Sequence, residues 1–400
     1  MKLRKVTELI AEKFLMLCSS VTTLTVILIV IFLFSEGMGL FKSSDIEEGY
    51  ALVVNSENPV SKLSPEQIME VFDSKVTLWS EVGGNDEPIL LFRLNDLPAY
   101  FTEEEMGDEL QYVPQCIGQL VSKEPGIIAF VPKMYVDSTA SGIKVMEEGH
   151  IRPGDFFDGK YWYPTSQPAP LFGVLPLVMG TLWVSLWAIL IALPFGLAVA
   201  IYLAELADSR LRSMLKPVIE LLAGIPSVVY GFFGLVVIVP LIQKGFGLSV
   251  GETGLAGSII LAIMALPTII TVAEDALRTT PRSMKEASLS LGASHWQTIY
   301  KVVIPYSLSG ITAAVVLGIG RAIGETMAVL MVTGNAAVIP TTLLEPMRTI
   351  PATIAAELGE APAGGAHYEA LFMLGCILFV MTLIISISVE FINSKKIGRQ

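Results

Sequence analysis

The chain has 400 residues, of which 52% are hydrophobic and 16% are charged. This composition is too apolar for a soluble globular protein and favours a polytopic membrane protein. The formal net charge is −12, and no basic patch is interleaved with aromatic residues, so the sequence has no signature of nucleic-acid binding.

About 20 apolar residues cross a bilayer core of roughly 30 Å. The first such run, 15–34, follows a basic start and lacks a clear cleavage site, so we expect a retained anchor and not a signal peptide. Five further runs have the required length: 175–203, 218–242, 255–272, 302–332 and 371–392. The sequence therefore predicts an all-α membrane protein with six transmembrane helices.

Lys and Arg gather at the N-terminus, at the C-terminus and in the segments 205–217 and 273–301. In a six-span topology these segments share one side, which the positive-inside rule assigns to the cytoplasm. Residues 42–170 then lie outside the cell or in the periplasm. They hold 9 Lys and Arg against 22 Asp and Glu, so this segment contains essentially all of the net negative charge. We predict a cell-membrane protein, multi-pass, with both termini cytoplasmic.

The external segment 42–170 is long enough for a compact domain, and its pattern is α/β. Strands are predicted at 50–55, 89–94, 126–131 and 143–146. Ser64, Pro65 and Gln67 form the sequence of a capping box that begins a helix ending near residue 72. A second helix is predicted at 98–110. The expected organisation is therefore 1–41 (cytoplasmic segment and first span), 42–170 (external α/β insert) and 171–400 (a core with five spans).

The third span contains Gly224, Pro226 and Gly231 within a short apolar stretch. Glycines thin the surface of a helix, and proline frees a backbone carbonyl. We expect these residues to serve helix packing or a hinge between two states.

A cytoplasmic loop at 276–301 separates the fourth and fifth spans. Its sequence around Glu286, Ala287, Ser288, Gly292 and Ala293 predicts a helix that ends at Gly292, followed by a second short helix. Small side chains here allow another protein to approach the backbone closely. A helix-Gly-helix projection of this kind can fit a groove on a partner.

The fifth span places Arg321 and Glu325 in an otherwise apolar run. An unpaired charge at mid-bilayer costs at least about 2.5–3.5 kcal/mol, so we expect both to face the bundle interior and, with Thr326, a polar pathway. Their spacing of four predicts a shared helix face, which also allows a simple structural ion pair. Gly320 and Gly324 form a Gly-x-x-x-Gly pair that predicts close packing against another helix.

These residues resemble a known family. Glu286-Ala287-Ser288 with Gly292 resembles the coupling loop of ATP-binding-cassette (ABC) importer permeases, and the stretches 221–235, 320–335 and 350–361 resemble the PstC-type permeases of phosphate ABC transporters. The resemblance covers about 172–395 and the first span.

It implies a type I ABC importer permease that works by alternating access. The expected partners are a second, PstA-type permease, a dimer of ABC ATPase subunits, an external phosphate-binding protein and membrane lipid. ATP and Mg would be bound by the ATPase partner. In this chain we expect no catalytic residue, no metal site and no cofactor.

Residues 50–135 of the insert resemble one lobe of a periplasmic phosphate-binding protein. Arg93 stands where that fold has an arginine-bearing strand and is a candidate phosphate contact. The following residues, 95–100, replace the usual Ser-Gly-Thr cradle, and Asp96 would repel a dianion. The insert is therefore expected to be degenerate, and to dock the binding protein, to cap the entrance or to have no role.

Two alternatives to phosphate import stay open from the sequence. One is a permease for another oxyanion such as molybdate, tungstate or sulfate, because a coupling loop does not specify the solute. The other is a membrane component of phosphate signalling that does not transport, with the acidic insert as its sensor.

Overall fold

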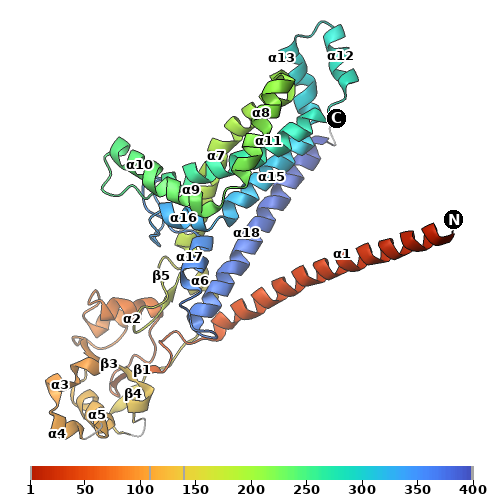
Figure 1. Ribbon diagram of the computed structural model, residues 1–400. Helices are drawn as coiled ribbons and strands as arrows, with labels where there is room; N and C mark the ends of the chain where they lie inside the picture. Colours follow the sequence, from red (N-terminus) through yellow and green to blue (C-terminus); the bar gives the residue numbers. More distant parts are fainter. Residues whose placement is uncertain (1, 108–109, 138–139, 398–400) are drawn as a thin grey trace. The chain divides into compact units, whose positions relative to one another are not determined.

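The computed structural model describes residues 2–107, 110–137 and 140–397. The chain divides into two compact units. The helical unit comprises Met1–Gly37, Leu175–Ala361 and Leu371–Gln400, and the insert unit comprises Met38–Val174 and Pro362–Ala370 (Figure 1).

A four-stranded sheet with the strand order β2-β3-β1-β4 forms the centre of the insert unit. β1 pairs antiparallel with β3 and β4, whereas β2 pairs parallel with β3. β1 and β3 are buried along most of their length because they occupy the middle of the sheet. The four strands lie within one residue of their predicted positions: β1 (Tyr50–Asn55), β2 (Leu90–Arg93), β3 (Ile127–Pro132) and β4 (Ile143–Val145).

The helix α2 (Pro65–Phe72) has the predicted capping box and the predicted end. The Ser64 hydroxyl accepts from the Gln67 amide at 3.3 Å, and the Gln67 side chain accepts from the Ser64 amide at 3.0 Å. These bonds satisfy two backbone donors that the first helical turn leaves free.

The single helix predicted at 98–110 is wrong. Two short helices stand there, α3 (Leu97–Tyr100) and α4 (Glu103–Met106), and the last part of the prediction includes 108–109, outside the described residues. Phe101 adopts an extended conformation, with φ −136° and ψ 144°, and this ends α3. α5 (Val113–Lys123), which was not predicted, buries its apolar face in the core of the insert.

The insert unit also contains α6 (Pro153–Phe157) and a two-stranded sheet of β5 (Trp162–Tyr163) and β6 (Leu171–Phe172). Trp162 and Phe156 are almost completely buried and anchor this part of the insert.

Among the described residues, five helical segments are long and apolar enough to cross a membrane, and a bent pair of helices makes a sixth candidate. Four of the five lie largely in α1 (Lys2–Gly37), α7 (Leu175–Ile201), α11 (Gly254–Arg278) and α18 (Ala366–Ile397). The fifth is Ser227–Phe246, and the bent pair is His295–Tyr306 with Leu308–Gly324, at 70°.

The core of the helical unit forms where α11 packs between α7 and α15 (Leu308–Gly324) (Figure 1). Small residues allow the close approach, since a Cβ added at Gly196 of α7 would meet Ile269 of α11 at 2.8 Å. The Ser258 hydroxyl of α11 donates to the Val184 carbonyl of α7 at 3.2 Å. α11 is therefore the central helix of the unit.

The predicted third span, 218–242, is not one continuous helix. α8 (Ser209–Ala223) ends before a break at Gly224 and Ile225, and α9 (Ser227–Phe233) begins after Pro226, followed by a π-helical turn and α10 (Val239–Phe246). Pro226 has no backbone N–H and disfavours a helical residue before it, which explains the interruption.

The predicted fifth span, 302–332, is also interrupted. α15 ends at Gly324, and the short helix α16 (Met327–Val332) follows. Before α15 come α12 (Arg282–Ser290), α13 (His295–Thr298), a π-helical turn and α14 (Ile304–Tyr306), and α17 (Ile350–Glu357) lies between α16 and α18.

Candidate functional site

Arg321 lies near the end of α15, half-buried among apolar side chains. Its Nη1 donates a hydrogen bond to the Thr268 hydroxyl of α11 at 3.2 Å. Thr268 follows Pro267, which lies inside α11. The neighbouring helix therefore fixes the position of the guanidinium, while part of the group stays accessible.

The shared helix face predicted for Arg321 and Glu325 is wrong. α15 stops at Gly324, and Glu325 has an extended backbone with φ −73° and ψ 132°. Among the residues that the structure describes, no ion pair joins the two side chains. The Glu325 carboxylate instead accepts a long hydrogen bond, 3.4 Å, from the Ala328 amide in the first turn of α16. A carboxylate is favourable at a helix N-terminus because the helix dipole is positive there.

Thr326 completes the break between α15 and α16. Its hydroxyl donates to the Gly324 carbonyl at 3.4 Å, which is one of the acceptors that the end of α15 leaves free. Charged side chains, a free helix end and a new helix start thus lie within six residues. Interrupted helices of this kind can present polar backbone groups along a pathway through a membrane.

The Gly-x-x-x-Gly pair does not pack against a helix of this chain. A Cβ added at Gly320 or Gly324 would meet no atom within 4 Å, and both residues are exposed. Close packing on α15 is made instead at Gly310, where an added Cβ would meet Ala276, and at Gly318, where it would meet Ile269 at 2.9 Å. The surface at Gly320 and Gly324 is therefore open in the isolated chain.

The glycines of the third span differ in their surroundings. Gly224 is exposed at the break, next to the proline that begins α9. Gly231 lies against α16, where an added Cβ would be 2.8 Å from Met331 and 3.0 Å from Ala328. The Tyr230 hydroxyl donates to the Leu222 carbonyl at 2.8 Å and so links the helices on both sides of the break. The two interrupted segments of the unit are thus packed together.

The predicted coupling loop forms two short helices around a glycine. α12 ends before Gly292, whose φ of +86° is a conformation that glycine adopts readily, and the Ser294 hydroxyl caps α13. Glu286 and Ala287 are exposed, and Leu291 is 89% exposed at the tip. An exposed apolar tip between two helix ends is suited to insertion into a partner.

Two contacts hold the loop to the rest of the helical unit. The Ser288 hydroxyl bonds to the Thr298 hydroxyl at 3.0 Å and so links α12 to the segment that leads into α15. The Lys285 ammonium pairs with the Glu205 carboxylate at 2.6 Å and links α12 to the π-helical end of α7. Ala293, half-buried after Gly292, completes the turn.

A buried carboxylate that was not among the predicted site residues lies near the same end of the unit. Glu274 of α11 is 1% exposed and pairs with Arg212 and Lys216 of α8, at 3.1 Å each, and with Arg278 at 3.7 Å. The basic residues of 205–217 served only to predict orientation, and only the fold reveals that two of them converge on this carboxylate.

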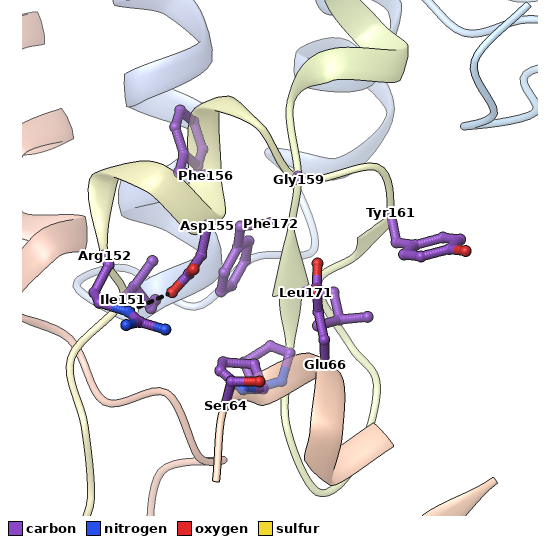
Figure 2. A pocket seen from close by; sticks show the side chains of 13 residues that line it. Ser64, Glu66, Ile151, Arg152, Asp155, Phe156, Gly159, Tyr161, Leu171 and Phe172 are labelled. Carbon is purple, nitrogen blue, oxygen red and sulfur yellow. Dashed lines mark hydrogen bonds and ion pairs between the residues drawn. The ribbon is translucent and has the colours of Figure 1, made fainter. Parts of the chain in front are cut away.

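In the insert unit, the Arg93 guanidinium packs over an aromatic ring. Its guanidinium carbon lies 5.4 Å from the centre of the Phe72 ring, and the Asp96 carboxylate accepts from its backbone amide at 2.8 Å. Figure 2 shows a different hollow, of about 140 Å³, in which Arg152 and Asp155 pair at 3.0 Å above Ser64 and Glu66. Arg93 does not line it.

The comparisons with known proteins agree with this architecture. Residues 192–398 match the family of binding-protein-dependent transport system inner membrane components. The chain is 40% identical over 246 residues to the probable ABC transporter permease protein YqgH of Bacillus subtilis, covering 62% of this chain and 79% of that protein. It is 41% identical over 249 residues to the phosphate transport system permease protein PstC of Mesorhizobium japonicum, covering 58% and 75%.

A solved structure of the MetNI methionine ABC transporter in an inward-facing conformation is also similar, with 20% identity, a TM-score of 0.43, and coverage of 55% of this chain and 96% of that one. The helical spans, the exposed helix-Gly-helix loop and the match over more than half of the chain lead to one conclusion. The chain belongs to the family of binding-protein-dependent transport system inner membrane components.

Proposed function

We propose that this chain is the transmembrane permease subunit of an ATP-driven importer of inorganic phosphate. The observation that carries the proposal is Arg321, a permanent cation held by Thr268 beside an interrupted helix in an apolar bundle. A guanidinium offers several hydrogen-bond donors that suit an oxyanion. Several of the similar proteins are phosphate transport system permeases, and for this reason we propose phosphate and not another oxyanion as the solute.

In this proposal Arg321 binds the anion and Glu325 limits how tightly it is held. Glu325 has no partner cation in the described chain, so its charge opposes an anion at Arg321 and helps the anion to leave. Thr326 supplies a hydroxyl at the same break. Gly224, Pro226 and Gly231 allow the packed segments around the break to change between two arrangements.

We further propose that the exposed loop around Glu286, Ala287, Ser288 and Gly292 docks on an ABC ATPase that binds ATP and Mg. Lys285–Glu205 and Ser288–Thr298 would transmit its movement to α7 and α15. The open surface at Gly320 and Gly324 supports a contact with a second permease of the PstA type. In this proposal the coupling loop and both termini lie in the cytoplasm, on the side of the ATPase.

For the insert we propose docking of the external phosphate-binding protein. Residues 42–170 are strongly acidic, and the three described hollows of the insert share the segment 161–173 as part of their lining. Tyr161 and Tyr163 stack at 6.2 Å between ring centres and are both exposed there. Aromatic side chains with few degrees of freedom are common at protein interfaces. Arg93, stacked on Phe72, would serve the fold and not phosphate.

The test is uptake of radiolabelled phosphate into proteoliposomes that contain the full complex, with and without ATP. We expect ATP-dependent uptake that sulfate and molybdate do not reduce. Arg321→Gln should abolish uptake while assembly is retained, and Arg210→Gln, an exposed arginine of α8 with no proposed role, is the matched control. Uptake by the Arg321→Gln complex at the normal rate would contradict the proposal. ATP hydrolysis without uptake in the wild type would favour the signalling alternative.

A further inference from the structure

The segment 333–349, between α16 and α17, contains a cluster of unsatisfied polar atoms. In the described part of the chain, five buried side-chain atoms lack a hydrogen-bond partner, and three of them are here: Asn335 Oδ1, Arg348 Nε and Thr349 Oγ1. A buried polar atom without a partner is costly, so such atoms are rare in native proteins. Three of the five therefore fall within one short segment.

The backbone brings these residues near one another. Gly334 and Met347 pair as an isolated parallel bridge, and the Met347 amide donates to the Thr333 carbonyl at 2.9 Å. Asn335 and Arg348 are the next residues on the two sides of this bridge, and Thr349 follows. The Ile350 amide donates to the Thr181 hydroxyl of α7 at 2.9 Å, which fixes this segment against the bundle.

Each of the three side chains has one hydrogen-bonding atom without a partner. Arg348 Nη1 pairs with Glu357 at 2.6 Å, which leaves Nε as an unused donor. Thr349 is 4% exposed and stands at the N-cap of α17, yet its hydroxyl makes no cap bond. The Asn335 amide nitrogen donates to the Leu330 carbonyl at 2.6 Å, so its oxygen remains an acceptor. The set thus offers an arginine N–H, a hydroxyl and an amide oxygen.

This set matches the chemistry of a protonated oxyanion. The arginine and the hydroxyl can donate to anionic oxygens, and the amide oxygen can accept from an acidic P–OH group. Phosphate carries at least one such proton near neutral pH, whereas sulfate carries none. An acceptor that only a protonated anion can satisfy discriminates strongly, because the wrong anion leaves it unpaired.

The cluster lies close to the break between α15 and α16. α16, with six residues, separates it from the break at Glu325 by roughly 9 Å at 1.5 Å per residue. Within the helical unit, α16 and α17 lie at the end opposite to α12 and α13 (Figure 1). An anion that entered at this end would meet Arg348 before it reached Arg321.

We propose that Arg348, Thr349 and Asn335 form a second oxyanion-binding station, on the external side of Arg321, that selects hydrogen phosphate over sulfate. The inference rests on the proposed phosphate import. The three atoms are enclosed in this structure, so an anion would reach them only if segment 333–349 opened.

The test uses the full complex in proteoliposomes and measures phosphate KM and maximal rate separately. Thr349→Val removes an unpartnered hydroxyl without changing its shape, so it should leave assembly and thermal stability intact. It should raise the phosphate KM by about fivefold to tenfold, the effect of one lost hydrogen bond to a charged group. Thr353→Val is the control, because that buried hydroxyl is already bonded to the Thr349 carbonyl at 2.9 Å.

Two further variants test the other members. Arg348→Gln should raise the phosphate KM by at least about tenfold. Asn335→Gly tolerates the φ of 51° at this position, removes the acceptor, and should make sulfate an inhibitor of phosphate uptake. If wild-type complexes take up phosphate but Thr349→Val and Arg348→Gln keep its KM, the station is disproved and phosphate import stands. If wild-type complexes take up none, the proposed function itself fails.

Discussion

The guanidinium of Arg321 is held by Thr268, at 3.2 Å, and not by Glu325, although only four residues separate the two charged groups in the sequence. An arginine held by a neutral hydroxyl keeps its full charge available to an anion. A carboxylate in the same place would neutralise it. This relationship makes Thr268 a positioning residue for the proposed transport.

Thr268→Val should lower the rate of phosphate uptake by roughly tenfold, because a hydrogen bond to a charged group contributes about 1.5–3 kcal/mol. Thr268→Ser keeps the hydroxyl and should stay close to the wild type. The measurement is ATP-dependent uptake in proteoliposomes, with complex assembly followed by size-exclusion chromatography. Equal uptake by the Val and Ser variants would show that Thr268 does not position Arg321.

Leu291→Ser should uncouple ATP hydrolysis from transport with little effect on the stability of the chain. The side chain is 89% exposed at the tip of the coupling loop, so its removal costs the isolated fold almost nothing. We expect about a tenfold loss of ATP-dependent uptake if the tip enters an apolar groove of the ATPase, since a buried leucine contributes roughly 1.5–3 kcal/mol. A variant with normal uptake would remove Leu291 from the interface.

Gly231→Ala and Gly320→Ala should separate packing within the chain from packing between chains. The added Cβ at Gly231 would press on Met331 and Ala328, so we expect the purified chain to lose about 1–3 kcal/mol of stability. Gly320 has free space around it, so Gly320→Ala should leave the thermal midpoint of the purified chain unchanged.

Gly320→Ala also tests how the complex assembles. If the surface at Gly320 contacts a second permease, Gly320→Ala should reduce recovery of the complex in a pull-down while the single chain stays stable. A normal yield of complex would show that this surface faces lipid or the pathway instead.

Asp45→Asn should stabilise the insert at pH 8. Asp45 is 4% exposed, and burial raises the pKa of its carboxyl although the Gly149 amide donates to it at 2.8 Å. The folded insert therefore favours the protonated form, and the cost of the buried charge is full above the folded pKa and absent below the unfolded value of 3.8. The stabilisation, measured as a shift in thermal midpoint, should shrink as the pH is lowered. A shift that grows toward acid pH would contradict this account.

The sequence predicted the local features that depend on neighbouring residues. The capping box at Ser64 and the helix end before Gly292 both follow from side chains within a few positions, and both are confirmed. In the third span the sequence predicted a packing or hinge role for Gly224, Pro226 and Gly231, but not that the helix is broken there. The interruption of the fifth span was missed, because an apolar run is compatible with a straight helix and with a broken one. The proline at 226 was a usable signal, whereas nothing near Gly324 in the sequence requires α15 to end there.

The contacts that define the candidate site depend on residues far apart in the chain. Thr268 and Arg321 are separated by 53 positions, and Lys285 and Glu205 by 80. Neither pair could be chosen from the sequence, since many polar residues lie near the ends of the spans. The unsatisfied atoms at Asn335, Arg348 and Thr349 are likewise visible only after every buried group has been matched with its partners.

The insert unit is joined to the helical unit at four points along the chain, after Gly37, Val174, Ala361 and Ala370. Within the insert, the Ser43 hydroxyl donates to the Glu369 carboxylate at 2.6 Å, so the first turn of α18 is bonded to the segment after α1. The insert is therefore built from two stretches that lie far apart in the chain, Met38–Val174 and Pro362–Ala370. A fragment that ended at Val174 would lack Glu369 and its bond to Ser43, so the insert is complete only when residues 362–370 are present.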